Sequence, residues 1–101
     1  MIDVRIYEII WKEQFVEKII RKHGVTPSEV EQALLSKPYI RKAEKGQVKG
    51  EDVYVAYGQT RSGRYLLVFF INKRRGAVMP ISARDMNSKQ RRVYHAQKKA
   101  R

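Results

Sequence analysis

Residues 64–72 read "RYLLVFFIN", and this stretch determines the fold that the sequence predicts. Every position from Tyr65 to Ile71 is apolar, so a strand here would be hydrophobic on both faces, as a central strand covered on each side is. Turn-forming residues flank it, with "TRSG" before it (60–63) and "KRRG" after it (73–76). We therefore expect the middle strand of a sheet with packed layers on both sides.

Strand-like segments surround this central one. The segment "DVYVAYGQ" (52–59) alternates its side chains, "AVMPISA" (77–83) resembles a last strand, and "KPYIRKAEKGQVKG" (37–50) resembles a strand followed by a polar loop. Short turns join these segments, so we expect an antiparallel sheet of about four strands. Pro80 cannot donate a ladder hydrogen bond, which predicts a bulge or an edge near it. A further short strand-like alternation involves Ile2, Val4 and Ile6.

Two helices are expected between that first alternation and the sheet. Apolar residues at helical spacing predict the first helix over about residues 12–22, ended by Gly24 in a left-handed cap. The second helix lies in "VTPSEVEQALL" (25–35), where Thr26 and Glu29 form a capping box around a proline at the first helical position.

A third helix is expected at the C-terminal end. Asn87 and Gln90 have the spacing of a second capping box. Val93, Ala96 and Ala100 share one face of this helix, and so thin an apolar stripe predicts weak docking. The predicted fold is α+β, with two N-terminal helices, a small antiparallel sheet and a C-terminal helix in one domain spanning 1–101.

The charge is distributed unevenly along the chain. The 101 residues carry a net charge of +12, and residues 53–101 hold twelve Lys/Arg against the single acidic residue Asp85. So one-sided a field favours an acidic partner. Nucleic acid, an acidic protein and an anionic membrane are the candidates, and we favour nucleic acid because no strongly amphipathic apolar helix accompanies the charge.

Several classes of function are disfavoured by composition. With no cysteine and two histidines, the chain offers neither a disulfide nor a conventional zinc site. No apolar run approaches the roughly 20 residues that span a bilayer, and the charged N-terminus does not resemble a signal peptide. We expect a cytoplasmic protein without a metal or other cofactor, whose partner is not a membrane.

What remains is a set of cations and phenols. RNA cleavage needs few special groups, because the neighbouring 2′-hydroxyl of the substrate is itself the nucleophile. The protein orients this hydroxyl, stabilises the charge of the transition state and moves protons. Arginine supplies a planar fork for phosphate oxygens, and histidine exchanges protons near neutral pH. The candidates are Lys22, His23, Tyr57, Arg64, Arg84 and Tyr94.

Each candidate also has a structural interpretation. His23 could simply end its helix, Tyr57 could be a half-buried sheet residue, and Tyr94 could anchor the last helix. Arg84 could pair with a carboxylate, either Asp85 or Glu29. The cations of the last helix could be solvated or could attract phosphate diffusely: Arg91, Arg92, Lys98 and Lys99.

Three segments resemble the BrnT family, the toxins of type II toxin–antitoxin pairs, whose fold is similar to that of the RelE ribonucleases. These are "KHGVTPSEV" (22–30), "GQTRSGRYLLVFF" (58–70) and "ISARDM" with "KQRRVY" (81–94). The resemblance covers nearly the whole chain in order. It implies a ribonuclease that arrests translation, neutralised by a BrnA-like antitoxin with which such toxins often form heterotetramers. We further expect the cleavage to be a transphosphorylation that needs no metal ion.

The resemblance also extends to individual residues. The family's KHG, GR and SAR motifs and its helix tyrosine correspond to residues 22–24, 63–64 and 82–84 and to Tyr94. Our own hypothesis is that Arg64 and Arg84 hold the scissile phosphate in one shared pocket, with Lys22, His23 or Tyr94 moving protons. The residues expected to bind RNA are Tyr57, Arg61, Arg91, Arg92, Lys98 and Lys99.

Two alternatives to a ribonuclease stay open at this stage. Gln90 stands where the family usually has Glu, and Trp11-Lys12 where it has Trp-Asp. The missing carboxylate at position 90 favours a module that binds nucleic acid without cutting it. A second alternative is a subunit whose cationic face only docks an acidic antitoxin or represses an operon.

Overall fold

The computed structural model describes residues 5–44, 52–73 and 75–100. The elements in chain order are β1 (Glu8–Ile9), α1 (Glu13–His23), α2 (Pro27–Leu34), β2 (Tyr39–Glu44), β3 (Val53–Gln59), β4 (Tyr65–Asn72), β5 (Ala77–Asp85) and α3 (Ser88–Lys99). The chain is therefore α+β, and the two N-terminal helices and the C-terminal helix are where the sequence predicts them.

The sheet contains one strand more than expected. Strands β2 to β5 form the predicted antiparallel meander, but β1 pairs in parallel with β5, which gives the order β1-β5-β4-β3-β2. The parallel pair has only two rungs, Glu8 opposite Ala77 and Ile9 opposite Val78. A strand this short has no visible alternation in the sequence. Ile2 and Val4, which suggested a strand, lie outside the described residues.

Strand β4 is the central strand, as "RYLLVFFIN" predicts. Its side chains alternate between two cores. Leu66, Val68 and Phe70 belong to the core beneath α1 and α2, whereas Leu67 belongs to the second core, with Phe69 packed against it. We call the first side of the sheet the helix-pair face and the second the α3 face.

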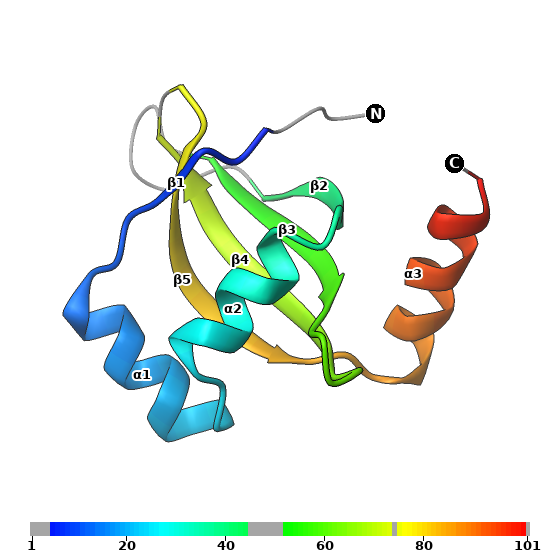
Figure 1. Ribbon diagram of the computed structural model, residues 1–101, viewed down its shortest axis with the longest axis horizontal. Coiled ribbons are helices and arrows are strands. Elements are labelled where there is room, and N and C mark those ends of the chain that lie inside the picture. Colours follow the sequence, from blue (N-terminus) through cyan, green and yellow to red (C-terminus); the bar gives the residue numbers. More distant parts are fainter. Residues whose placement is uncertain (1–4, 45–51, 74, 101) are drawn as a thin grey trace.

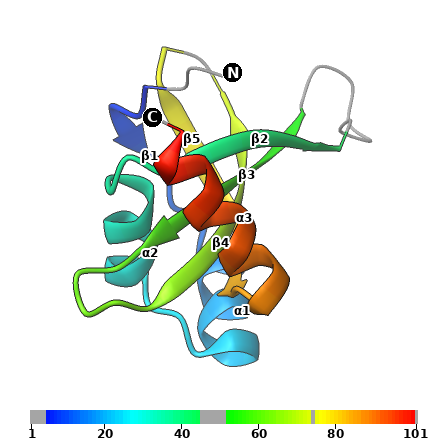
Figure 2. The same cartoon turned by 90° about the vertical axis from the view of Figure 1, so that its right-hand side faces the viewer.

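The two faces are covered unequally (Figures 1 and 2). Helix α1 packs against β5 and α2 against β3 and β4, while α3 stands on the other side against β2 and β3. Helix α2 approaches the sheet closely at Gly58, where an added Cβ would lie 2.5 Å from the carbonyl oxygen of Ala33.

The predicted local signals are confirmed. Gly24 ends α1 in the left-handed conformation (φ 61°), and both capping boxes form, Thr26 with Glu29 and Asn87 with Gln90. The register of β5 against β4 is interrupted by a bulge next to Pro80, where Phe69 and Phe70 face Ser82 and Pro80. The bulge determines which face of the sheet Arg84 occupies.

The docking face of α3 differs from the prediction. Ala96 and Ala100 are exposed, and the helix is anchored instead by Tyr94, which is completely buried, with Val93 half-buried beside it. A phenol ring covers far more apolar surface than an alanine methyl group, so the rotation that buries the ring is preferred.

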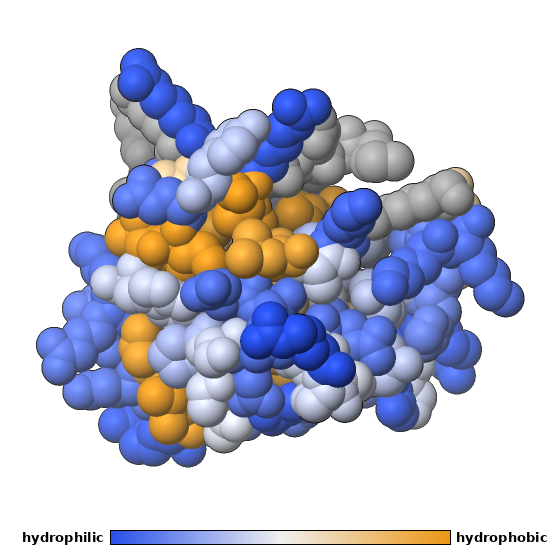
Figure 3. Space-filling view, in the orientation of Figure 1, coloured by the Kyte–Doolittle hydropathy of each residue, from blue (hydrophilic) through white to orange (hydrophobic). Residues whose placement is uncertain are grey.

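The surface also differs in hydropathy between the α1–α2 side and the α3 side of the molecule. Apolar side chains reach the surface on the side of the molecule that carries β1, α1 and α2, whereas the α3 side is hydrophilic (Figure 3). Among the described residues, the exposed large apolar ones are Tyr7, Trp11, Ile20 and Leu35. No helix in the described part of the chain is long and apolar enough to cross a membrane.

Candidate functional site

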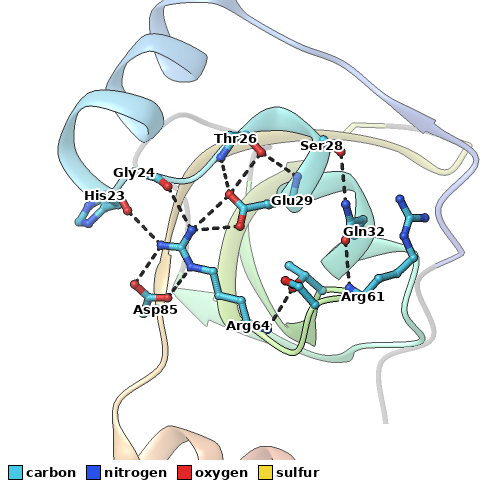
Figure 4. A network of polar contacts seen from close by, with 11 residues as sticks. His23, Gly24, Thr26, Ser28, Glu29, Gln32, Arg61, Arg64 and Asp85 are labelled. Carbon is cyan, nitrogen blue, oxygen red and sulfur yellow. Dashed lines mark hydrogen bonds and ion pairs between the residues drawn. The ribbon is translucent and has the colours of Figure 1, made fainter.

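Arg64 is held by a network at the junction of α1, α2 and the end of β5 (Figure 4). Its Nε and Nη2 donate to the carboxylate of Asp85 at 2.7 and 3.1 Å, and its Nη1 donates to Glu29 at 3.1 and 3.2 Å. The same guanidinium donates to the backbone carbonyl oxygens of His23 and Gly24 at 3.2 and 3.1 Å. Arg64 therefore ties three elements together.

This network shifts the ionisation of its members. Hydrogen bonds from Arg64 lower the pKa of Asp85, and the charge of His23 lowers it slightly further. The backbone N–H of Thr26 is the main cause that lowers the pKa of Glu29, with Arg64 adding to the effect. Hydrogen bonding to Asp85 raises the pKa of Arg64. Both carboxylates are therefore held in their charged form, and Arg64 is engaged by them.

Arg84 lies on the other side of the sheet. It pairs with Leu67 across the β4–β5 ladder, so it belongs to the α3 face, and its guanidinium lies 5.3 Å from the ring centre of Phe69. Its side chain is exposed, and no described carboxylate pairs with it. The salt bridge of Arg84 with Asp85 or Glu29 that the sequence left open does not form, because both carboxylates bind Arg64 on the opposite side of the sheet.

The two arginines consequently do not share a pocket. Arg64 points to the helix-pair face and Arg84 to the α3 face, with the sheet between them. The expectation of one pocket for the scissile phosphate is wrong in this respect. The reason is the alternation of β5, which sends Arg84 and Asp85 to opposite faces, and Arg64 follows its acidic partner.

The other predicted site residues are also divided between the faces. Lys22 and His23 are exposed at the end of α1, on the side of Arg64. Tyr94 is on the α3 face but is inaccessible, and its buried hydroxyl has no hydrogen-bond partner among the described residues. Tyr57 is buried as well, and its hydroxyl accepts hydrogen bonds from the guanidinium of Arg41 at 3.2 and 3.3 Å.

The cations predicted to bind RNA lie in two separate regions, the β3–β4 turn and helix α3. Arg61 is exposed in the β3–β4 turn beside a cavity that Ser28, Gln32 and Thr60 help to line. The cations of α3 lie on the other side. Lys98 places its ammonium 5.2 Å from the ring centre of Tyr94, and the remaining three are exposed on the helix: Arg91, Arg92 and Lys99.

The structure adds residues that the sequence did not single out. Besides Lys98, three cations on the α3 face lie near aromatic rings. These pairs are Arg41 with Tyr57, Arg84 with Phe69, and Arg91 with Tyr65. His95 joins the last pair, with its ring 5.4 Å from that of Tyr65. These pairs depend on strand register and helix rotation, which no local pattern of the sequence reveals.

Gln90 has a structural task in this arrangement. Its side-chain oxygen accepts a hydrogen bond from the backbone N–H of Asn87 at 2.9 Å, which completes the cap of α3. A carboxylate at this position would accept the same bond.

In the described part of the chain, no group of three or more His, Cys, Asp or Glu side chains is arranged to hold a metal ion.

Together, the α+β fold and the cation-rich α3 face define a small basic domain suited to an anionic polymer. The family described as ribonuclease toxin, BrnT, of type II toxin–antitoxin systems matches the chain over residues 11–90, so the chain belongs to the BrnT family. The fold is similar to the crystal structure of the Brucella abortus ribonuclease toxin BrnT, with a TM-score of 0.57 and 25% sequence identity. That similarity covers 80% of this chain and 97% of the Brucella chain. No curated protein matches the chain.

Proposed function

We propose that this BrnT-family toxin cleaves RNA by transphosphorylation without a metal ion and thereby arrests translation in the cytoplasm. The observation that carries the proposal is Arg84, an exposed guanidinium with no described carboxylate beside it, on a face rich in cations. A guanidinium in this state is available for two phosphate oxygens, whereas one already paired with carboxylates is not.

The chemistry uses few protein groups. The 2′-oxygen of the substrate forms a bond to phosphorus, and the bond from phosphorus to the 5′-oxygen of the next nucleotide breaks. One proton leaves the 2′-hydroxyl and one is delivered to the departing oxygen. Arg84 would stabilise the negative charge on the phosphoryl oxygens, which is the largest demand of the step. Lys22 and His23 lie on the Arg64 side of the sheet, at the end of α1. They would therefore transfer protons only to a substrate that extends to that end of the sheet, and proton transfer directly beside Arg84 would need a group of the α3 face.

A binding protein that does not cleave RNA is the second candidate, and two observations favour it. The amide of Gln90 cannot act as a base, and the hydroxyl of Tyr94 is buried away from any substrate. This alternative predicts that RNA is retarded in gels with affinity that falls steeply as salt rises, yet is recovered intact.

Membership of a toxin–antitoxin family supports a protein partner as well. We propose that a BrnA-like antitoxin, encoded by the neighbouring gene, binds and neutralises this toxin, with a heterotetramer as the assembly. Coexpression of both genes with a tag on one protein tests this directly. Recovery of the tagged protein alone would contradict it.

Cleavage is tested with purified protein and bulk RNA in the presence of EDTA. We expect the wild type to cleave and Arg84→Ala to lose cleavage, with an unchanged circular dichroism spectrum and no growth arrest on induced expression. Lys18→Ala removes an equally exposed cation from α1, outside the residues expected to bind RNA, and serves as the control, which should stay active. Continued toxicity of Arg84→Ala would remove Arg84 from the site.

A further inference from the structure

We propose that Tyr65, Arg91 and His95 form a subsite for an unpaired nucleotide of single-stranded RNA. This inference deepens the proposed function, because it takes RNA as the ligand and names the class of RNA. It does not require that the RNA be cleaved. None of the three residues was identified as a stacking site from the sequence.

The three side chains meet where α3 crosses the start of β4. The guanidinium of Arg91 lies 5.8 Å from the centre of the Tyr65 ring, and the imidazole of His95 lies 5.4 Å from it at an interplanar angle of 75°. Tyr94 lies beneath them, 6.0 Å from Tyr65. Tyr65 is half-buried, whereas Arg91 and His95 are exposed, so the group is open to solvent on one side.

The local structure holds these groups in place. The backbone N–H of Met86 donates to the carbonyl oxygen of Tyr65 at 3.0 Å, which fixes the exit of β5 beside the start of β4. The Asn87 cap then starts α3 directly afterwards. Arg91 and His95 are four residues apart, so they occupy the same side of the helix. The subsite is thus formed by regular elements and a tight connection.

The residue types suit an unpaired base. Proteins bind the bases of single-stranded RNA on aromatic rings and guanidinium planes, while neighbouring cations attract the phosphates. Helix α3 has no Asp or Glu, so no carboxylate of this helix opposes a phosphate. An imidazole edge and a guanidinium can also donate hydrogen bonds to base edges. A duplex would keep its bases stacked and out of reach.

The subsite lies on the same face of the sheet as Arg84. Tyr65, Leu67 and Phe69 follow each other on one side of β4, and Arg84 lies opposite Leu67 with its guanidinium near Phe69. The rise of a strand separates the backbone positions of Tyr65 and Phe69 by about 13 Å. An RNA strand bound at Tyr65 could therefore continue along the α3 face to a phosphate at Arg84.

The simpler interpretation is that Tyr65 and His95 only pack the helix onto the sheet. It predicts that removing the imidazole changes stability and leaves RNA binding alone. The two interpretations therefore differ in what they predict for the same variants.

The experiment measures binding of fluorescent 2′-O-methyl oligonucleotides, single-stranded or duplex, which the proposed reaction cannot cleave. We expect wild-type protein to prefer the single strand. Arg91→Gln and His95→Gln should each weaken single-strand binding by roughly tenfold, within the range for loss of one stacked base, and should change duplex binding much less. Tyr65→Leu should lose the preference as well.

Arg92→Gln is the matched control, because it removes a neighbouring cation that has no described ring contact. It should weaken single-strand and duplex binding by the same small factor, as loss of one diffuse charge does. Equal effects of Arg91→Gln and Arg92→Gln on single-strand binding, or a wild type without single-strand preference, would overturn the proposal. The outcome is independent of cleavage, so a protein that binds in this way but leaves ordinary RNA intact would refute the proposed ribonuclease and not the subsite.

Discussion

Replacement of Arg64 by methionine tests whether this arginine is a structural tie or a ligand for phosphate. Methionine keeps a long, flexible, apolar side chain but cannot donate a hydrogen bond. The substitution removes every contact of the guanidinium with Glu29, Asp85 and the carbonyl oxygens at the end of α1. It also leaves two carboxylates close to each other without their shared cation.

The expected loss follows from the exposure of each partner. The two hydrogen bonds to backbone carbonyl oxygens contribute about 1 kcal/mol each. The side chains of Arg64, Glu29 and Asp85 are 27%, 24% and 60% exposed. Solvent therefore screens both ion pairs, and each contributes at most about 1 kcal/mol, with the Asp85 pair weaker. We expect the free energy of unfolding to fall by about 3 kcal/mol in total, which corresponds to a drop in Tm of about 15 °C for a chain of this size.

Urea unfolding at neutral pH, followed by circular dichroism, measures the free energy of unfolding. Arg61→Met is the matched control, since Arg61 lies in the same turn and its side chain makes no hydrogen bond or ion pair with another described residue. Its effect should stay below about 0.5 kcal/mol. Equal stabilities of the two variants would refute the structural role. A stable Arg64→Met protein that has lost cleavage would instead restore the phosphate-binding role that the sequence predicts.

Three further variants or conditions test the packing and the charges. Gly58→Ala should lower the free energy of unfolding by about 1–3 kcal/mol, because the new methyl group would press against Ala33 of α2; urea unfolding measures this. Tyr94→Phe should keep cleavage and raise stability by about 1 kcal/mol, since it removes a buried unpartnered hydroxyl; loss of cleavage would show that Tyr94 does move protons. The lowered pKa values of Glu29 and Asp85 mean that their stabilising effect is complete above their unfolded values, near 4.5 and 3.8, and is lost as the pH falls through their folded pKa values. Tm measured against pH should therefore fall modestly in acid, and Arg64→Met should remove mainly the Asp85 part of that fall, because the N–H of Thr26 still lowers the pKa of Glu29 in the variant.

Much of the fold could be predicted because its signals are local. Helix caps such as Thr26 with Glu29 need only a few neighbouring residues, and the apolar run of β4 requires two covered faces wherever it lies. The strand β1 was not predictable, because two residues carry no period and its partner β5 is nearly seventy residues away in the chain.

The candidate site was only partly predictable, for a different physical reason. The type of residue needed for phosphate chemistry is visible in the sequence, and Arg84 was identified on that basis. Which cations face each other depends on strand register and on the rotation of α3, which burial of Tyr94 sets. The ring pairs of Arg41, Arg91 and His95 follow from that tertiary geometry and not from any motif.

The bulge beside Pro80 connects these observations. Val78 and Pro80 face the α1–α2 core, and strict alternation along β5 would place Arg84 on that same face, together with Arg64. The extra residue at the bulge inverts the alternation, so Ala83 and Asp85 face α1 and α2 while Ser82 and Arg84 face α3. The single carboxylate of the basic half of the chain is thereby paired with Arg64 on the far side of the sheet. The same inversion leaves Arg84 on the α3 face without an ion pair to any carboxylate of the described residues, so its guanidinium stays available to phosphate oxygens.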